Sequence, residues 1–270
     1  MGAVITESAR AVQTVHRALP LAAAAMGRLL TGAVFLGADL KGSGSVHLEM
    51  AGGGPLGRVI AEAYADGMVR GRVDHPAVEL PLTPAGKLAV GQGIGREGRL
   101  MVRRRLDHGG VYTSYAQLAT GEVGEDLARF LLDSEQVPAA VTVGVLVGTD
   151  GLVMAAGGLL VEALPGASPA VVNETADALV ALGAVSRRLA GGESPEQLLA
   201  QALPPPVQWL GRDRIRFGCL CDRRDLEGLI RSLPAADRRE MAAGGGAEVV
   251  CQYCRTAYRY DPDTLTGHES

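Results

Sequence analysis

The cysteines of this chain form two close pairs near its C-terminus. Cys219 and Cys221 are separated by one residue, Cys251 and Cys254 by two, and residues 1–218 contain no cysteine. A secreted protein stabilised by disulfides usually spreads its bridges through the fold. Two close pairs in an otherwise cysteine-free chain are more typical of a metal or redox site. We therefore predict that the four cysteines act together in one small module.

The spacing of the pairs suits a zinc ion. Two thiol pairs joined by a loop can place four thiolates at the corners of a tetrahedron, the geometry that structural Zn²⁺ prefers. Cys219, Cys221, Cys251 and Cys254 are accordingly predicted to bind one Zn²⁺ ion in the reduced state. The module of residues 213–270 is too short for a sizeable core. The metal is expected to supply much of its folding free energy, on the order of 10 kcal/mol in small zinc peptides.

Such a site has two possible roles: a permanent structural zinc site or a redox switch. Spacing by itself favours the structural site. The C-x-C arm favours the switch, since it is unusual beside the commoner C-x₂₋₄-C spacing. It permits a strained small-ring disulfide, and strained disulfides tend to be labile and regulatory. Four arginines near the thiols in sequence are expected to favour reactive thiolates: Arg216, Arg223, Arg224 and Arg255.

Composition argues against several partners. The net charge of −4 and the pI of about 5.8 give no general attraction to nucleic acid or anionic lipid. The apolar stretch 18–40 is interrupted by Arg28 and Asp39, so its uncharged runs fall short of the ~20 residues that span a bilayer. Glu7 disfavours a secretory signal at the N-terminus. We expect a cytoplasmic protein that contacts neither membrane nor nucleic acid.

The hydrophobic pattern predicts an α+β fold with a mixed sheet in the N-terminal domain. Polar and apolar residues alternate at Ser45–Met50, and Val59–Ala65 and Met68–Val73 flank Asp66-Gly67, which predicts a hairpin. Leu88–Gly91 and Leu100–Leu106 are predicted to form a second hairpin around a glycine-rich turn. The other expected elements are helices within 7–40 and at 122–133, and strands at 141–147 and 152–156.

The C-terminal part is expected to be a linker followed by the cysteine module. One helix is predicted over Asn173–Leu189 and a shorter one begins with Ser194 as N-cap and Pro195 at the first helical position. Within the module, a helix is predicted between the cysteine pairs, and Tyr258 and Tyr260 are expected to close a small hairpin. The predicted division is an α+β core domain at 1–168, a helical linker at 169–212, and a zinc-binding redox-switch domain at 213–270.

No catalytic constellation stands out, so an enzyme is not expected. Gly93–Gly98 matches G-x-G-x-x-G, but a strand pattern follows where a dinucleotide site needs a helix, so a hairpin loop is predicted. Two rival functions depend on the cysteines. A zinc-ribbon nucleic-acid module is disfavoured because the module is not basic. A thiol–disulfide oxidoreductase is disfavoured because Cys251 and Cys254 lead into a strand pattern rather than a helix.

Several segments resemble one protein family, the thirty-three-kilodalton heat-shock chaperones (33 kDa chaperonins). The C-x-C…C-x-x-C pattern matches, and the other matching segments occur in family order over essentially the whole chain. They are Ala25–Arg28, Thr120–Leu127, Ser134–Pro138, Gly144–Val147, Ala155–Gly158 and Leu164–Ala167. Met101–Leu106 is more basic than the usual family strand, and Gly124 replaces a more common alanine. Neither departure touches the cysteines.

The resemblance implies a redox-regulated, ATP-independent holdase. In such a protein the reduced, zinc-bound form is inactive. Oxidation forms two disulfides, here Cys219–Cys221 and Cys251–Cys254, and releases the zinc. The small domain and linker then unfold, and a homodimer holds unfolding client proteins. Unfolding is expected to uncover apolar linker residues that the zinc module had covered, among them Leu179, Leu182, Val185, Leu198, Leu199 and Trp209.

Overall fold

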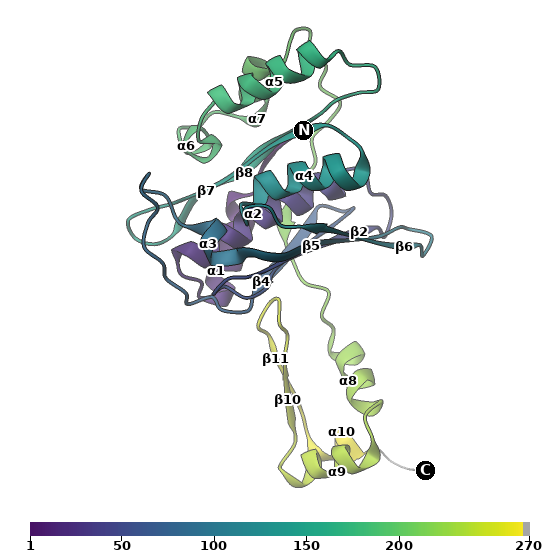
Figure 1. Ribbon diagram of the computed structural model, residues 1–270. Coiled ribbons are helices and arrows are strands. Elements are labelled where there is room, and N and C mark those ends of the chain that lie inside the picture. Colours follow the sequence, from purple (N-terminus) through teal and green to yellow (C-terminus); the bar gives the residue numbers. More distant parts are fainter. Residues whose placement is uncertain (267–270) are drawn as a thin grey trace. The chain divides into compact units, whose positions relative to one another are not determined.

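The computed structural model describes residues 1–266, which fall into two compact units (Figure 1). Unit 1, Met1–Phe217, contains β1 (Gly2–Val4), α1 (Thr6–His16), α2 (Pro20–Gly37), β2 (Ser45–Gly53), β3 (Val59–Tyr64), β4 (Met68–Val73), α3 (Val90–Ile94), β5 (Gly95–Arg105), β6 (Val111–Gln117), α4 (Val123–Glu135), β7 (Ala139–Val147), β8 (Val153–Glu162), α5 (Pro169–Ala181), α6 (Val185–Ala190), α7 (Pro195–Ala202) and β9 (Arg216–Phe217). Unit 2 begins at Gly218 and contains α8 (Arg223–Arg231), α9 (Ala235–Ala243), β10 (Ala247–Val250), β11 (Ala257–Tyr260) and α10 (Pro262–Thr266). The predicted α+β class is confirmed.

Unit 1 is built on two sheets with one helix between them. The larger sheet has the order β6-β5-β2-β3-β4-β9, and its neighbours are antiparallel except for the pair β4 and β9. The smaller sheet has the order β1-β8-β7 and is antiparallel. Helix α2 packs against β3 of the larger sheet and against β7 and β8 of the smaller one (Figure 1). The core of unit 1 therefore surrounds α2.

The composition of α2 explains its central place. Pro20 occupies its first turn, where a missing N–H costs little, and small or aliphatic residues cover almost every side of the helix. By length and apolarity alone α2 could cross a membrane, but 83% of its apolar window is buried inside unit 1. Its one charged residue, Arg28, pairs with Glu122 at 2.5 Å. These features are those of a core helix.

The first predicted hairpin is confirmed and the second is wrong. β3 and β4 pair through the turn at Gly67, whose φ of 79° suits glycine, while the Asp66 carboxylate accepts a hydrogen bond from the Met68 N–H. Residues 90–94 instead form helix α3, and β5 pairs with β2 and β6. A Cβ on Gly52 would lie 2.1 Å from the Gly95 carbonyl oxygen. These two glycines thus permit a close approach of strands.

The linker segment also differs from the sequence prediction. The single helix expected over Asn173–Leu189 is divided into α5 and α6, because Gly183 has a φ of 72° and Ala184 is extended. The predicted start of α7 is confirmed. There the Ser194 hydroxyl accepts a hydrogen bond from the Gln197 N–H, and the Gln197 side chain accepts one from the Ser194 N–H. This capping box satisfies two backbone donors.

The apolar side of the linker helices is covered within unit 1. Leu179, Val185, Leu198 and Leu199 are buried in a cluster with Leu159 of β8. The expectation that the zinc module covers these four residues is therefore wrong, because the smaller sheet already packs against them. Trp209, by contrast, is 51% exposed.

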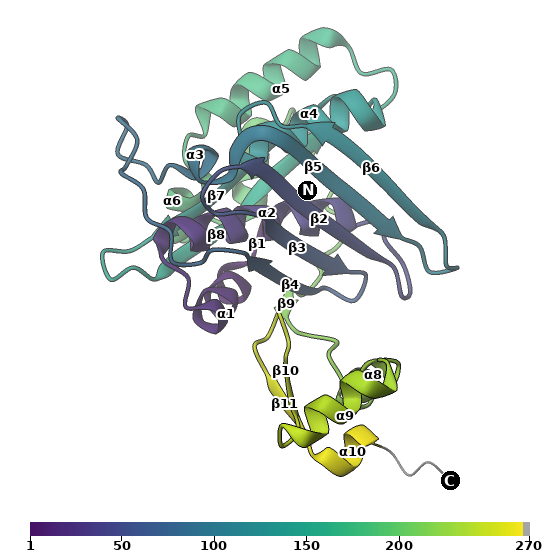
Figure 2. The ribbon, with the colours of Figure 1, turned by 60° about the horizontal axis from the view of Figure 1, so that its bottom comes forward.

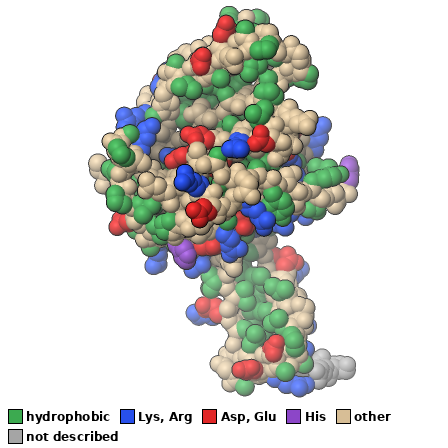
Figure 3. All heavy atoms as spheres, in the orientation of Figure 1, with side chains coloured by type: hydrophobic (Ala, Val, Ile, Leu, Met, Phe, Trp, Pro, Cys, Tyr) green, Lys and Arg blue, Asp and Glu red, His purple; other side chains and the backbone are tan. Residues whose placement is uncertain are grey.

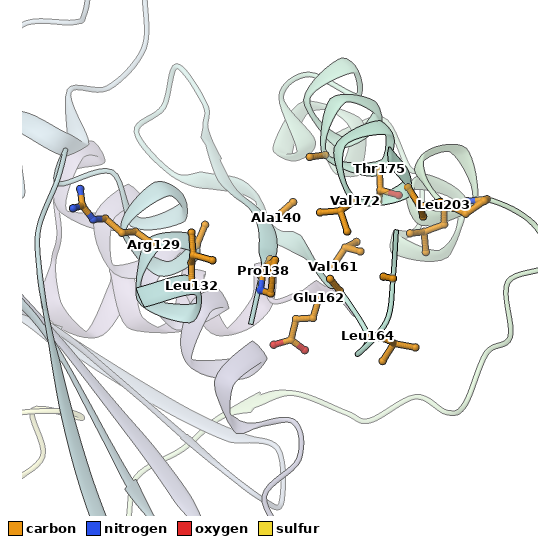
Figure 4. A pocket seen from close by; sticks show the side chains of 17 residues that line it. Arg129, Leu132, Pro138, Ala140, Val161, Glu162, Leu164, Val172, Thr175 and Leu203 are labelled. Atoms are coloured by element: carbon orange, nitrogen blue, oxygen red, sulfur yellow. The ribbon is translucent and has the colours of Figure 1, made fainter. Parts of the chain in front are cut away.

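An apolar groove opens beside this cluster, between α4, the ends of β7 and β8, and α5 (Figure 4). Its volume is about 490 Å³, and its lining includes Leu132, Val161, Leu164, Val172 and Leu203. Hydrophobic side chains are visible over this part of unit 1 in Figure 3. Helix α5 thus buries one side against the small sheet and leaves another facing a groove.

Unit 2 has little core. Its fully buried apolar residues among those described are Ile230, Tyr260 and Leu265, with a few partly buried neighbours. Helix α8 occupies the predicted position between the cysteine pairs, and the Asp222 side chain caps it by accepting from the Arg224 N–H at 2.7 Å. β10 and β11 form the small hairpin expected around Tyr258 and Tyr260. The boundary between compact units falls after Phe217, and the three-part division of the chain stays a prediction.

Candidate metal centre

The two cysteine pairs lie on two different kinds of backbone. Cys219 and Cys221 are on the irregular segment between β9 and α8. Cys251 and Cys254 are on the turn that joins β10 to β11. That turn is closed by hydrogen bonds from the Cys251 N–H to the Thr256 oxygen and from the Arg255 N–H to the Cys251 oxygen, both 2.9 Å. A short turn fixes one pair, and the cap of α8 fixes the segment that carries the other.

The four sulfurs gather at one point. All lie within 4.8 Å of one another, and all four residues are half-buried. Cys219 Sγ is 3.6 Å from Cys251 Sγ, and Cys221 Sγ is 3.3 Å from Cys254 Sγ. A tetrahedral zinc site with Zn–S bonds of about 2.3 Å separates its sulfurs by about 3.8 Å. The donor set and its spacing thus fit a tetrahedral metal ion, and the sulfurs are not joined in disulfides.

Two side-chain hydroxyls approach the sulfurs, one for each pair. Tyr258 Oη lies 3.1 Å from Cys221 Sγ and donates to the Cys221 carbonyl oxygen at 3.3 Å. Thr256 Oγ1 lies 3.2 Å from Cys254 Sγ. Partners of this kind orient metal ligands and tune their reactivity. The sequence pattern placed Tyr258 in the hairpin but did not predict its contact with the sulfur. The signal for this contact is that Thr256 and Tyr258, two hydroxyl residues, follow Cys254 at positions two and four.

The thiols differ in how readily they ionise. Burial and hydrogen bonding with the other thiols raise the pKa of Cys221 to about 12. Burial also raises the pKa of Cys251. Burial opposes ionisation of Cys254 too, but hydrogen bonds from Thr256 and from neighbouring thiols lower its pKa to about 7. Of Cys221, Cys251 and Cys254, the last is therefore the thiol that most readily becomes the nucleophilic thiolate in the metal-free cluster.

The arginines near the thiols in sequence do not all serve the thiols. Arg216 pairs with Asp66 at 2.5 Å. Arg223 donates to the Arg259 carbonyl oxygen, and its guanidinium lies 5.0 Å from the Tyr260 ring centroid. The expectation that Arg216 and Arg223 hold the thiolates is thus wrong, since both guanidinium groups are engaged elsewhere. The Tyr258 and Thr256 hydroxyl groups and the other sulfurs make close contacts with the thiols.

The glycine-rich stretch at 93–98 and a carboxylate network on the larger sheet both play structural parts. Gly93 lies at the end of α3 and Gly95 begins β5, so the G-x-G-x-x-G stretch runs from a short helix into a strand, and the predicted hairpin loop is wrong. His47 Nδ1 is 2.9 Å from Glu62 on the larger sheet. Glu62 also accepts hydrogen bonds from Tyr64 and Arg70, both 2.6 Å. This buried carboxylate network joins three strands, and sequence reasoning missed it because register brings its members together.

Comparison with known proteins agrees with this geometry. Residues 1–261 match the model of a family described as Hsp33 protein. A 33 kDa chaperonin of Desulforamulus reducens is 37% identical over 262 residues, covering 96% of this chain and 89% of that protein. A 33 kDa chaperonin of Staphylococcus aureus is 36% identical, covering 97% and 90%. The crystal structure of the 33 kDa chaperonin from Thermotoga maritima superposes with a TM-score of 0.90 at 31% identity, covering 98% of this chain and 91% of that one.

Proposed function

The chain belongs to the Hsp33 family, and on that premise we propose that it is an ATP-independent holdase chaperone switched by oxidation of its four cysteines. The reduced, metal-bound form is inactive. Oxidation joins Cys219 to Cys221 and Cys251 to Cys254, and the oxidised form binds unfolding proteins. One observation carries the proposal: four cysteine sulfurs within 4.8 Å of one another in a unit with almost no core.

The metal assignment follows from the donor set. Cys219, Cys221, Cys251 and Cys254 would hold Zn²⁺ as thiolates, and the ion would supply cross-links that the small core of unit 2 cannot provide. Tyr258 and Thr256 would orient the sulfurs of Cys221 and Cys254. The ion is a structural support in this proposal.

The redox step balances with peroxide as the oxidant. Four thiolates lose four electrons and form two S–S bonds, while two molecules of hydrogen peroxide take up those electrons with four protons and give four waters. Sulfurs in a disulfide no longer carry the negative charge of a thiolate ligand, so the cysteines lose their hold on the metal. Unit 2 then lacks its main source of folding free energy.

The consequence for client binding follows from the linker packing. Leu179, Leu198 and Leu199 are buried against Leu159 of β8. If the linker helices unfold with unit 2, as the proposal states, these side chains and their partners on the small sheet become exposed together. Large exposed apolar surfaces bind other proteins. We propose a cytoplasmic location and a homodimer as the active form, on the basis of family resemblance.

The disulfide pairing can be tested directly, because trypsin separates the two arms. Cys219 and Cys221 fall in the peptide 217–223, and Cys251 and Cys254 fall in the peptide 240–255. After peroxide treatment and blocking of free thiols, the proposed pairing leaves two separate peptides, each two hydrogens lighter. Peptides linked across the arms would contradict it. The sulfur distances leave this open, since a tetrahedral cluster brings each sulfur near the other three.

The function is tested by client aggregation. A thermally unfolding client is followed by light scattering with reduced, zinc-loaded protein or with protein oxidised by peroxide at raised temperature. We expect suppression only by the oxidised form, near stoichiometrically and without ATP. Equal suppression by both forms would make the zinc site merely structural. No suppression by either form would contradict the holdase function.

The oxidoreductase alternative is less well supported by the structure. Cys251 and Cys254 lie on a turn between two antiparallel strands, whereas redox C-x-x-C motifs usually begin a helix after a strand. The Hsp33 relatives are named chaperonins, which indicates a chaperone rather than an enzyme. Turnover of a disulfide substrate with a dithiol donor would support the enzyme instead.

A further inference from the structure

The larger sheet of unit 1 ends in a long strand with an open edge. β6 has seven residues and lies outside β5 (Figure 2), and no second strand pairs with it among residues 1–266. The opposite edge is β9, which has only two residues. An unpaired edge presents a row of backbone donors and acceptors, and proteins usually shorten or protect such edges. β6 is therefore an exposed site for strand pairing.

The register shows which backbone groups point outward. The Leu118 N–H bonds the Gly98 oxygen at one end of β6, and the Leu106 N–H bonds the Gly110 oxygen at the other. Alternate residues of antiparallel strands make the ladder bonds, so the even-numbered residues of β6 pair with β5. The odd-numbered residues direct their N–H and C=O groups toward the open edge: Val111, Thr113, Tyr115 and Gln117.

The side chains of β6 do not protect this edge. The strand reads Val-Tyr-Thr-Ser-Tyr-Ala-Gln, without lysine, proline or any charged residue. Val111 is 57% exposed, Tyr112 64% and Tyr115 51%. Exposed, β-prone and uncharged strands are those that accept another extended chain. The edge is thus uncharged in its side chains and unpaired in its backbone.

The next strand gives the surface a positive charge. Arg99, Arg103 and Arg105 of β5 are exposed, and the register places their side chains on the same face as Thr113 and Tyr115. The Arg99 guanidinium lies 4.5 Å from the Tyr115 ring centroid, which carries its charge over β6 toward the edge. A chain that pairs with β6 would place alternate side chains beside this face. Acidic side chains there would be favoured over basic ones.

We propose that the open edge of β6 receives an extended segment of an unfolding client as a seventh strand of the larger sheet. The favoured segment is β-prone and uncharged or acidic. This inference rests on the proposed holdase function and adds a binding site to it. Backbone pairing is indifferent to most side chains, which suits a protein that must hold many sequences. Pairing by one strand is weak alone, so it would act together with the apolar surface that oxidation exposes.

The test uses the full-length protein and a short fluorescein-labelled peptide that alternates Val with Thr and Glu. Amide exchange followed by NMR should show new protection at Val111, Thr113, Tyr115 and Gln117 when the peptide binds. The edge is open with the cysteines unjoined, so the peptide should bind the reduced and the oxidised forms. The same amides should gain protection when the oxidised protein holds a denatured client.

A single substitution separates backbone pairing from side-chain contact. Thr113→Pro removes one outward N–H without removing a ladder bond, whereas Thr113→Val keeps the N–H and changes only the side chain. We expect about tenfold weaker peptide binding for the proline variant, as for the loss of about one hydrogen bond, and little change for the valine variant. Equal affinities would overturn the proposal. Should the proline variant fail to fold, the wild-type amide exchange decides.

The remaining outcomes distinguish this inference from the holdase function. If the oxidised protein suppresses aggregation but the four edge amides exchange as before, the edge is not the client site and the holdase function stands. If the amides become protected on raising the protein concentration alone, the edge pairs with a second copy, which overturns client binding there. If neither form suppresses aggregation, the holdase function fails whatever the peptide does.

Discussion

Unit 1 and unit 2 are both α+β structures, but they are stabilised in different ways. Unit 1 surrounds α2 with a continuous apolar core drawn from both sheets and from α1, α3 and α4. Up to residue 266, unit 2 has three buried apolar residues and a cluster of four sulfurs. Burial stabilises a fold under any redox condition, whereas thiolate ligation depends on the oxidation state of sulfur. On the proposed mechanism, a redox signal would unfold unit 2 and the linker helices of unit 1 and spare the core around α2.

Metal removal is expected to produce the largest difference in stability between the two units. A strong chelator added to reduced protein should unfold unit 2, because the lost metal contributes on the order of 10 kcal/mol in zinc peptides. Unit 1 should keep its protected amides, including those of Leu48 and Val102 in paired central strands. Amide exchange by NMR measures both units in one sample. Retained protection at Val249 and Tyr258 would contradict the dependence of unit 2 on the metal.

The converse change weakens unit 1 alone. Leu30 is fully buried on α2, and a Cβ added to Gly71 of β4 would lie 3.3 Å from its Cδ2 atom. Leu30→Ala should cost about 2–5 kcal/mol through lost burial and the resulting cavity. The midpoint of unit 1 unfolding in urea would fall, while the rate of zinc transfer to a colorimetric chelator stays unchanged. Leu164→Ala is the matched control, since Leu164 is 78% exposed. Faster zinc transfer in Leu30→Ala would show that the units depend on each other.

Tyr258→Phe probes the stability of unit 2 at one hydroxyl. Loss of the Tyr258 hydroxyl beside Cys221 Sγ should speed zinc transfer to a chelator by about tenfold, the lower end for partners of metal ligands. Tyr260→Phe is the control, because its hydroxyl donates to the Arg223 carbonyl oxygen at 2.9 Å rather than contacting a sulfur. Equal rates in the two variants would assign the effect to general destabilisation.

Sequence predicted what depends on local spacing. The cysteine pattern indicated the cluster of four sulfurs because each pair is set within a few residues, and the Ser194 cap and the turn at Asp66-Gly67 are equally local. The helix break at Gly183 was missed because a helix tolerates glycine, and the sequence alone does not show a positive φ. Tyr258 meets Cys221 across 37 residues, because the β10–β11 hairpin packs against the segment before α8. Glu62 meets His47 across 15 residues through strand register. The open edge of β6 likewise depends on sheet order, which is non-local.

The smallest expected effect is a pH dependence of unit 1 at Asp74. Burial opposes ionisation of this carboxyl, but hydrogen bonds from Arg58 and Arg72 outweigh it and hold its pKa below the ordinary value of 3.8. The carboxylate therefore stabilises unit 1 fully above about pH 4, and this stabilisation is lost as pH falls through the lower folded pKa. Half of Arg58 is exposed, so solvent screening limits the contribution to less than about 1 kcal/mol. At pH 7, Asp74→Asn should lower the urea midpoint of unit 1 below that of the wild type, and near pH 2 this difference in midpoint should be smaller. A difference of the same size at low pH would assign the effect to packing rather than charge.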